Sequence, residues 1–451
     1  MADPQNEFLA WKKLTKGLRN PTNSLDKEAH KKSFFSMPLI PHPTTVTDAF
    51  FQPLHGLVAA SPHTRSCPEF TDEQWLRLGL ARVLEPVESG RAFLQEHGPR
   101  FADPPGSTNY FFSLASERRR DLALGVNLAL IARMTVPDRL AEIPELAQYE
   151  CFALDGHWHK AATHDAQHEG VKMAVGHFYS LNLRGHQMRH LAAGEGLHEH
   201  DMSVLKRINP KGLRQGVAMG RRVLIVYDKA GIDFDFWKRG CRRCAVYFVS
   251  RVKDGMVYDW IESREVNRRD QRNRGVTEDR SVMTREGHLL RIVGYTEPES
   301  GETYEFLTNE RDLPPGVIVE VYRRRWEVEK VFDEIKNKLG EKKAWATSLV
   351  AKAVQGQMVA ITHNLMLLYE GRLEQDHGVT NTAEDKRREK RAAQMAKVAA
   401  AAGRPVSSLL LIARRATQRS VKFVRWLRHA IREDLAEAVA APRLAALYAT
   451  L

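Results

Sequence analysis

One segment of the chain places an acid, two bases and a phenol at helical spacing. At about 100° per residue, positions 3, 4 and 7 residues apart fall within about 60° of one another on a helix. The residues with this spacing are Tyr322, Arg325, Glu329 and Lys336. The apolar residues of the segment gather about 100° further round. They are Val328, Val331, Ile335 and Leu339. The segment predicts a helix with an apolar face for the core and a second face suited to phosphate chemistry.

Two aspartates upstream add to this face. Asp155 follows the apolar run 149–154, and Asp228 follows the run 222–227. Apolar runs of this length are typical of buried strands, so both acids are expected at strand ends, where a sheet meets solvent. With Glu329 they make three carboxylates. The alternative for the helix alone is an ordinary amphipathic surface helix in which Glu329 pairs with the arginine four residues earlier.

Three carboxylates suit the cleavage of a phosphodiester. The reaction needs an activated attacking oxygen and a stabilised leaving oxygen, and two divalent cations can supply both. Hard cations such as Mg²⁺ take oxygen ligands. Asp155 between two ions, with Asp228 on one and Glu329 on the other, would hold such a pair and leave positions for water and phosphate.

The spacing Tyr, two residues, Arg, three residues, Glu, six residues, Lys resembles the signature of the IS4-family DDE transposases of bacterial insertion sequences. The Asp155–Gly156 pair and Asp228 resemble the family's two catalytic aspartates, which follow strands. Residues 304–309 resemble the strand before the signature helix, and residues 362–365 the helix after it. The resemblance covers about residues 145–370.

The resemblance implies an RNase H-like catalytic domain that cuts and rejoins DNA at the ends of its own element. It implies that Asp155, Asp228 and Glu329 are catalytic and bind two Mg²⁺ ions, with Mn²⁺ as a substitute. The expected partners are the terminal inverted repeats, target DNA and a second copy of the chain. The residues predicted to contact DNA are Tyr322, Arg323, Arg325, Trp326, Lys336 and His157. Trp326 would stack on an unpaired base, and core packing is its alternative.

Several neighbouring residues compete with these assignments. Asp233 and Asp235 follow Asp228, but neither ends an apolar run; Glu327 and Glu334 lie about 160° and 140° from Glu329 on a helical wheel. The histidines at 157, 159, 164 and 168 lack a usual zinc spacing and are interpreted as loop residues near the site. The single C-x-x-C pair of Cys241 and Cys244 is interpreted as incidental.

Composition agrees with a protein that binds a polyanion. The chain has 451 residues and a formal net charge of +12, which favours nucleic acid as a partner. Four cysteines are too few for a disulfide framework. Neither a membrane-spanning run nor a secretory signal is evident, so we expect a cytoplasmic protein associated with a bacterial nucleoid.

The patterns predict an α/β fold with an RNase H-like mixed sheet. Residues 1–70 are expected to be a loosely ordered arm, and residues 71–146 a helical module that could bind DNA ends. Residues 147–370 are expected to be the catalytic domain, with strands near 149–155, 172–181, 187–192 and 222–228, a helix near 201–208 and a β-rich insertion at about 240–310. Residues 371–451 are expected to be basic and helical, with a linker at 371–384, a break near Pro442 and a dimerisation element as one alternative.

These observations favour a DDE transposase. The competing hypothesis is a non-catalytic, sequence-specific DNA-binding protein derived from one. A third is a metal-dependent nuclease of the same fold that does not join the cut ends.

Overall fold

The computed structural model describes residues 44–449, apart from 67–69, 88, 102–105, 169, 173–174, 195–198, 200, 229–231, 299–300, 340–342, 382–389, 391–392, 395–396, 398–399 and 402–420. The chain divides into two compact units, Met1–His42 and Pro43–Leu451, and all described residues belong to the second. Most of the predicted N-terminal arm therefore lies outside the described residues. The part from residue 44 onwards is ordered: α2 (Val46–Phe51) buries Phe50 and Phe51 completely.

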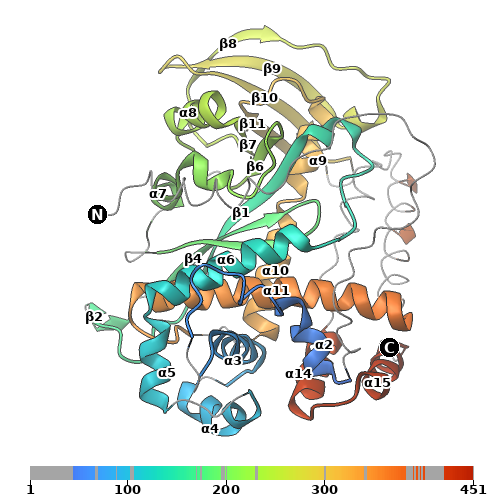
Figure 1. Ribbon diagram of the computed structural model, residues 1–451. Coiled ribbons are helices and arrows are strands. Elements are labelled where there is room, and N and C mark those ends of the chain that lie inside the picture. Colours follow the sequence, from blue (N-terminus) through green and yellow to red (C-terminus); the bar gives the residue numbers. More distant parts are fainter. Residues whose placement is uncertain are drawn as a thin grey trace, which may run out of the picture. The chain divides into compact units, whose positions relative to one another are not determined.

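A nine-stranded mixed sheet fills the upper part of the unit as drawn in Figure 1, in the order β5-β4-β1-β6-β7-β11-β10-β9-β8. β1 runs antiparallel to β4 and parallel to β6, and β6 runs parallel to β7. An antiparallel group β5-β4-β1 continued by two parallel strands is the RNase H-like arrangement, so the predicted fold class is confirmed. The strands are β1 Tyr149–His159, β4 Val175–Asn182, β5 Met188–Ala193, β6 Arg222–Val226, β7 Val246–Arg251, β8 Tyr258–Ser263, β9 Val276–Thr284, β10 Leu289–Thr296 and β11 Thr303–Thr308, with a separate pair β2 Gln167–His168 and β3 Val171–Lys172.

The predicted β-rich insertion continues the same sheet instead of forming one of its own. β11 pairs with β7, and β10, β9 and β8 follow it outwards. The sequence did not reveal β9, because its interior carries the charged residues Asp279 and Arg280. Both are buried in ion pairs: Asp279 binds Arg291 of β10 at 2.7 Å, and Arg280 binds Glu278 at 2.6 Å. Buried charges of this kind interrupt the apolar alternation by which a strand is recognised.

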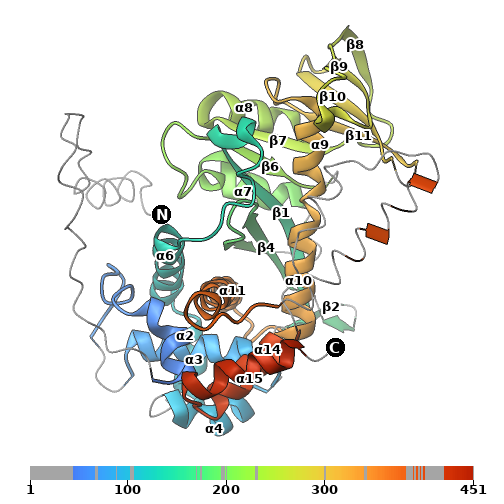
Figure 2. The same cartoon turned by 90° about the vertical axis from the view of Figure 1, so that its right-hand side faces the viewer.

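Helices cover both faces of the sheet. α7 (Asp201–Leu213) and α8 (Phe234–Cys244) pack on one face. The other face meets α9 (Pro315–Arg323), α10 (Trp326–Lys338) and the long α11 (Leu349–His377). Figure 2 views α11 almost end on, with α6 and α10 beside it and further helices beyond it. The N-terminal helices are α2, α3 Asp72–Leu84, α4 Gly90–Phe101, α5 Ser107–Leu114 and α6 Glu117–Arg133, and the C-terminal ones are α14 Val421–Arg432 and α15 Glu437–Ala449.

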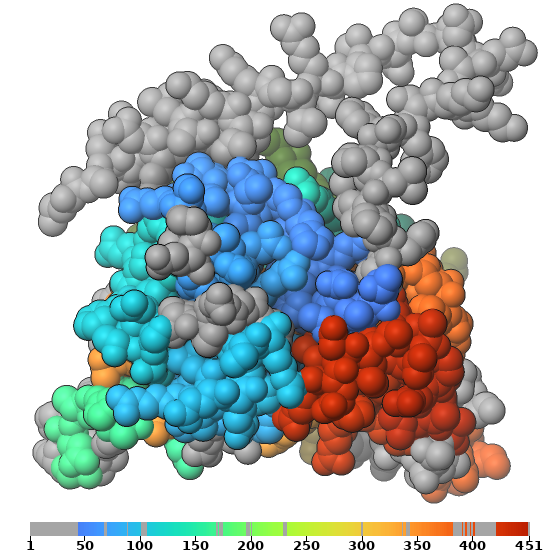
Figure 3. All heavy atoms as spheres, turned by 60° about the horizontal axis from the view of Figure 1, so that its bottom comes forward, coloured from blue at the N-terminus to red at the C-terminus, as the bar shows by residue number. Residues whose placement is uncertain are grey.

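The N- and C-terminal helices of this unit form one layer. In Figure 3 the red C-terminal helices lie directly against the blue N-terminal ones. The N–H of Val46 donates to the carbonyl of Leu435, and the N–H of Glu437 donates to the carbonyl of Thr44. Arg432 also forms an ion pair with Glu85 at 2.7 Å. The described part of the C-terminal region is therefore integrated into the fold.

Two predicted boundaries at the C-terminal end were wrong. α11 continues past Gly371 to His377 and ends where Gly378 adopts a left-handed conformation (φ 63°). Pro442 lies inside α15, whereas the break falls earlier, between α14 and α15, where Asp434 has φ 44°. Proline therefore marks the first half of a helix here and not its end.

Side chains of α11 cover the outer edge of the sheet. Asn364 accepts from the N–H of Met188 at 2.8 Å and donates to its carbonyl at 2.9 Å. Gln357 donates to the carbonyl of His190, and His363 donates to the carbonyl of His186. These contacts satisfy the backbone groups that an edge strand leaves unpaired, so β5 is fixed to the buried helix as well as to β4.

Three buried histidines form a chain across β1, β4 and β5. His177 lies 2.8 Å from His159 Nε2 and 3.1 Å from His190 Nε2. The direction of the chain follows from its ends, since Nδ1 of His159 can only donate to the carbonyl of Lys160, and Gln357 can donate to Nδ1 of His190. Each ring is then neutral, with one donor and one acceptor used. The prediction of loop histidines near the site was wrong for His157 and His159, because β1 extends through both, and for His168, which lies in β2.

Burial lowers the pKa of His177 well below its ordinary value and that of His190 to about 3. The folded state then binds fewer protons than the unfolded state below about pH 6.5, so stability should fall on acidification by up to about 1.4 kcal/mol per pH unit for each histidine. Urea unfolding between pH 7 and about pH 5 tests this. His190→Gln keeps an N–H donor and should weaken the pH dependence. The exposed His164→Gln is the control; equal slopes in both variants and the wild type would contradict the prediction.

Candidate active site

The alternation of β1 and β6 sets the direction of the two aspartates. On β6, Leu224 and Val226 face the core beneath α9 and α10, and Val223 and Ile225 face α7 and α8. On β1, Ala153 faces the α10 side and Leu154 the other. Because side chains alternate with period 2, Asp155 points to the α10 side.

Asp155 was predicted at a strand end and lies instead inside β1, opposite Tyr179 of β4. The parallel pairing with β6 does stop before it, at Ala153 and Val226. Continuing that register by two residues would bring Asp228 alongside Asp155, about 5 Å away across the sheet. The side chain of Asp155 is 25% exposed, while Asp228 is exposed in the loop after β6.

The signature segment forms two helices where one was predicted. α9 ends at Arg323 and α10 begins at Trp326. Arg324 and Arg325 keep helical angles, and the N–H of Arg325 bonds three residues back to Tyr322. The two helices consequently run almost in line (Figure 2), and Tyr322, Arg325 and Glu329 lie on one side, because Arg325 contacts both of the others. The predicted apolar stripe is buried, at Val328, Val331, Ile335 and Leu339.

Arg325 stands between the acids. Its Nη2 lies 2.7 Å from Glu329 Oε1, and its Nη1 lies 3.7 Å from Asp155 Oδ2. The guanidinium carbon lies 5.9 Å from the ring centre of Tyr322 and 5.8 Å from that of Trp326. The side chain is only 10% exposed. The Arg325–Glu329 pair is the one expected of a simple amphipathic helix. The contact of Arg325 with Asp155 in addition connects α10 to β1.

The charges around Asp155 oppose one another. Burial raises its pKa to about 6, while Arg325 and the N–H of Gly156 act to lower it. Glu329 and Asp201 raise it further. Asp228 likewise interacts with Arg325. The Arg325 guanidinium therefore interacts with three carboxylates in this region, those of Asp155, Asp228 and Glu329.

Asp201 was not singled out from the sequence. It is the first residue of α7, and a Cβ built on Gly156 would lie 3.7 Å from its Oδ1. Its only sequence signal was an acid at a predicted helix start, which is common for any helix. The packing of α7 against β1 brings it to Gly156, on the face of the strand opposite to Asp155, and its charge still acts on Asp155.

The other predicted DNA contacts differ in their surroundings. Trp326 is 60% exposed, which excludes core packing. Tyr322 is buried against Phe306, and burial raises the pKa of its phenol, so it remains a neutral donor. Arg323 turns away and pairs with Glu297 at 3.3 Å.

Two further predictions fare differently. His157 is completely buried, so its predicted contact with DNA was wrong. It lies on the same face of β1 as Asp155, but there α10 covers it, with the ring of Phe332 5.5 Å away. Lys336 lies in α10 as predicted, but its side chain is outside the described residues.

The rival acids have other roles. Asp233 caps α8 by accepting from the N–H of Phe236 and pairs with Lys206 at 2.7 Å. Asp235 is 73% exposed and lies 3.4 Å from His288. Cys241 and Cys244, a turn apart on α8, are both free thiols.

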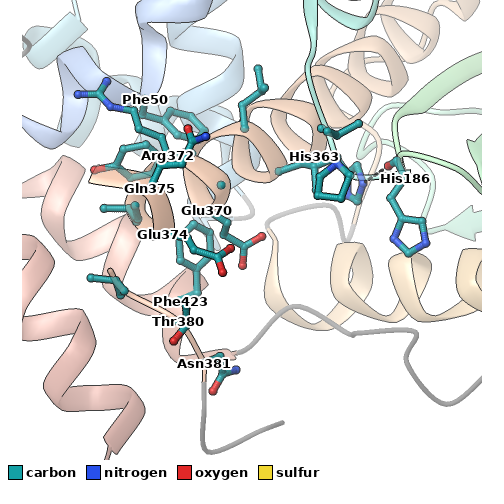
Figure 4. Close-up of a pocket in the computed structure, with 18 of the residues that line it drawn as sticks. Phe50, His186, His363, Glu370, Arg372, Glu374, Gln375, Thr380, Asn381 and Phe423 are labelled. Carbon is teal, nitrogen blue, oxygen red and sulfur yellow. Dashed lines mark hydrogen bonds between the residues drawn. The ribbon is translucent and has the colours of Figure 1, made fainter. Parts of the chain in front are cut away.

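Glu327 and Glu334 face the other side of α10. Glu327 pairs with His186, and Glu334 lies 3.7 Å from His363. These four residues line part of a cavity of about 690 Å³ between α10, α11 and the C-terminal helices, in which Figure 4 shows His186 and His363 side by side. This cavity is separate from the face that carries Glu329, because Glu327 and Glu329 lie about 160° apart on the helix.

Oxygen donors of this kind suit a hard divalent cation. Asp155 and Glu329 converge on one point, but Arg325 is already there. Within the described ranges, no three His, Cys, Asp or Glu side chains lie close enough together to hold a metal ion. The carboxylate oxygens of Asp155 and Glu329 are chemically suited to such an ion. In this structure the guanidinium of Arg325 takes the position between them.

Residues 182–365 match the family model of the transposase DDE domain. The match includes Asp228 and the whole segment from Tyr322 to Lys336, while Asp155 precedes it. It supports a DDE transposase. A cryo-EM structure of piggyBac transposase in a synaptic complex with hairpin DNA is similar over 88% of this chain and 81% of that one, at 11% identity and a TM-score of 0.38, too low to bear on fold or function. No curated protein matches the chain.

Arg325 should compete with a divalent cation for the carboxylates. A charge-assisted hydrogen bond is worth about 1.5–3 kcal/mol, so Arg325→Gln should raise the affinity of the DNA-free protein for Mn²⁺ by about tenfold or more. Titration calorimetry measures this directly. Arg323→Gln is the matched control, because Arg323 pairs with Glu297. Unchanged or weaker Mn²⁺ binding in Arg325→Gln would contradict the competition.

Proposed function

We propose that this protein is a DNA transposase of the IS4 kind, which cuts and rejoins strands at the ends of an insertion sequence. The observation that carries the proposal is the convergence of Asp155 from β1 and Glu329 from α10 on Arg325, with Asp228 following the adjacent strand. The match to the transposase DDE domain supports it independently.

Transposase DDE domains generally use divalent metals, and we propose two Mg²⁺ ions here, with Mn²⁺ as a substitute. Asp155, Asp228 and Glu329 would hold them. When bound, such ions activate the attacking oxygen and neutralise charge on the leaving oxygen. The chain's own part is to hold the three carboxylates near one another, from two neighbouring central strands and one helix, and to keep most of the Asp155 side chain away from bulk water.

The same face would bind the end of the DNA. Arg325 can turn from the carboxylates to a phosphate and bind it with two parallel N–H groups. The neutral phenol of Tyr322 would donate a further hydrogen bond, and Lys336 would add a point charge. Trp326, exposed beside Arg325, offers a ring on which an unpaired base can stack. Arg323 could contact the DNA only if its ion pair with Glu297 broke.

The partners proposed are the terminal inverted repeats, target DNA and a second copy of the chain in the DNA complex. The helical module at 71–146 is proposed to bind the DNA ends. No helix among the described residues is long and apolar enough to cross a membrane. We propose that the protein acts in the bacterial cytoplasm, at the nucleoid.

The test is strand cleavage on a plasmid that carries the DNA flanking the protein's own gene, with and without Mg²⁺. Asp155→Asn, Asp228→Asn and Glu329→Gln should each reduce cleavage by about a thousandfold or more, since residues that act as a unit fail together. DNA binding and folding should persist in all three. Mapping the strand ends shows where the cuts fall.

Asp235→Asn is the matched control, because this exposed acid follows Asp228 closely and should leave cleavage unchanged. Normal cleavage by any of the three variants would overturn that residue's assignment. Stable binding without cuts under any metal would indicate a non-catalytic DNA-binding protein. Cuts without joining of the released 3′-OH to target DNA would indicate a nuclease.

A further inference from the structure

A groove of about 430 Å³ lies between the C-terminal half of α10 and the first turns of α14. α10 contributes Asp333, Asn337 and Lys338, and α14 contributes Arg425 and Arg428. It is separate from the cavity in Figure 4, which shares none of these residues. Nothing in the proposed chemistry uses it.

The groove continues the face of α10 that carries Glu329. Asp333 and Asn337 follow Glu329 by 4 and 8 residues, so they lie about 40° and 80° round the helix from it. At 1.5 Å per residue, Asn337 is about 12 Å further along the axis. A strand held at Glu329 and running along this face would enter the groove.

The charge of the groove is positive. Among the described residues that line it, Lys338, Arg425 and Arg428 outnumber one acid, Asp333, which accepts a hydrogen bond from Asn337 at 2.6 Å. Arg428 is fixed, because it donates to the carbonyls of Leu84 and Lys338 at 2.7 Å. Both acceptors are neutral carbonyl groups, and the acid that acts on Arg428, Glu85, is itself paired with Arg432.

Arg425 is the cation most available to a ligand. Its side chain is exposed, and it makes no ion pair with any residue that the structure describes. By contrast, Arg432, two turns further along α14, is paired with Glu85. The three basic side chains, Arg428, Arg425 and Lys338, are spread along the groove between two helices. Such a spread of charge suits several successive phosphates better than a single small anion.

We propose that this groove binds the phosphate backbone of the DNA strand that leaves the candidate active site, with Arg425 as the principal contact. The proposal rests on the proposed function, since the strand is the one held at Glu329. One strand carries a phosphate about every 3.4 Å of duplex axis, so the contact falls about three or four phosphates from the scissile one.

The experiment measures binding of the full-length protein to a duplex of the DNA flanking its gene, over a range of salt concentrations. Arg425→Gln should weaken binding and reduce the slope of log affinity against log salt by about 1, the loss of one phosphate contact. Arg432→Gln is the matched control, with the same charge change on the same helix, and should keep the wild-type slope.

Single neutral methylphosphonates in the duplex locate the contact. In the wild type, substitution three or four phosphates from the cut should weaken binding, and in Arg425→Gln the same substitution should cost nothing further, because the two changes remove one interaction. Wild-type slopes and undiminished methylphosphonate losses in Arg425→Gln would overturn the groove proposal alone. A wild-type protein that neither binds nor cuts this DNA would overturn the proposed function and the groove with it.

Discussion

The candidate site depends on one electrostatic constraint: carboxylates brought together need a cation between them. Asp155 and Glu329 come from a strand and a helix that are far apart in sequence, and in this structure Arg325 supplies the positive charge. Burial of Asp155 makes the requirement stronger, because water solvates the charge of a mostly buried carboxylate poorly. The same arginine is the group best suited to bind a phosphate. Phosphate binding and exposure of the carboxylates are thereby linked through one side chain.

The rigidity needed to hold these groups comes from behind the sheet. α11 is buried along most of its length, and Asn364, Gln357 and His363 satisfy the backbone of the edge segment around β5. The neutral histidine chain continues this support across β4 to β1. Polar groups buried in this way specify one arrangement, because any shift would leave donors or acceptors unpaired. β1 is thus fixed on its α11 side, and the position of Asp155 follows from it.

The protein exposes less positive charge at its surface than its net charge suggests. In the arginine-rich region of the insertion, Arg291 is buried with Asp279, Arg280 binds Glu278 and Glu305, and Arg272 binds Glu145 and Asp270. These arginines stabilise β9, β10 and their connections. A count of basic residues therefore overstates the positive surface there, whereas exposed residues such as Arg425 carry charge that a polyanion can reach.

The sequence by itself revealed the helical spacing of Tyr322, Arg325 and Glu329, the two aspartates and the positions of most strands along the chain. Helical spacing is a local periodicity, and the strands are recognised by local β-branched runs. It did not reveal β9, the break between α9 and α10 or the burial of His157. These depend on ion pairs, backbone turns and neighbouring helices that are distant in the chain. Only the tertiary structure decided that Asp155 lies within a strand, that Asp201 lies against the neighbouring Gly156 and that Arg325 separates Asp155 from Glu329. The reason is that contacts across a sheet and between helices are set by packing, which leaves no periodic trace in the sequence.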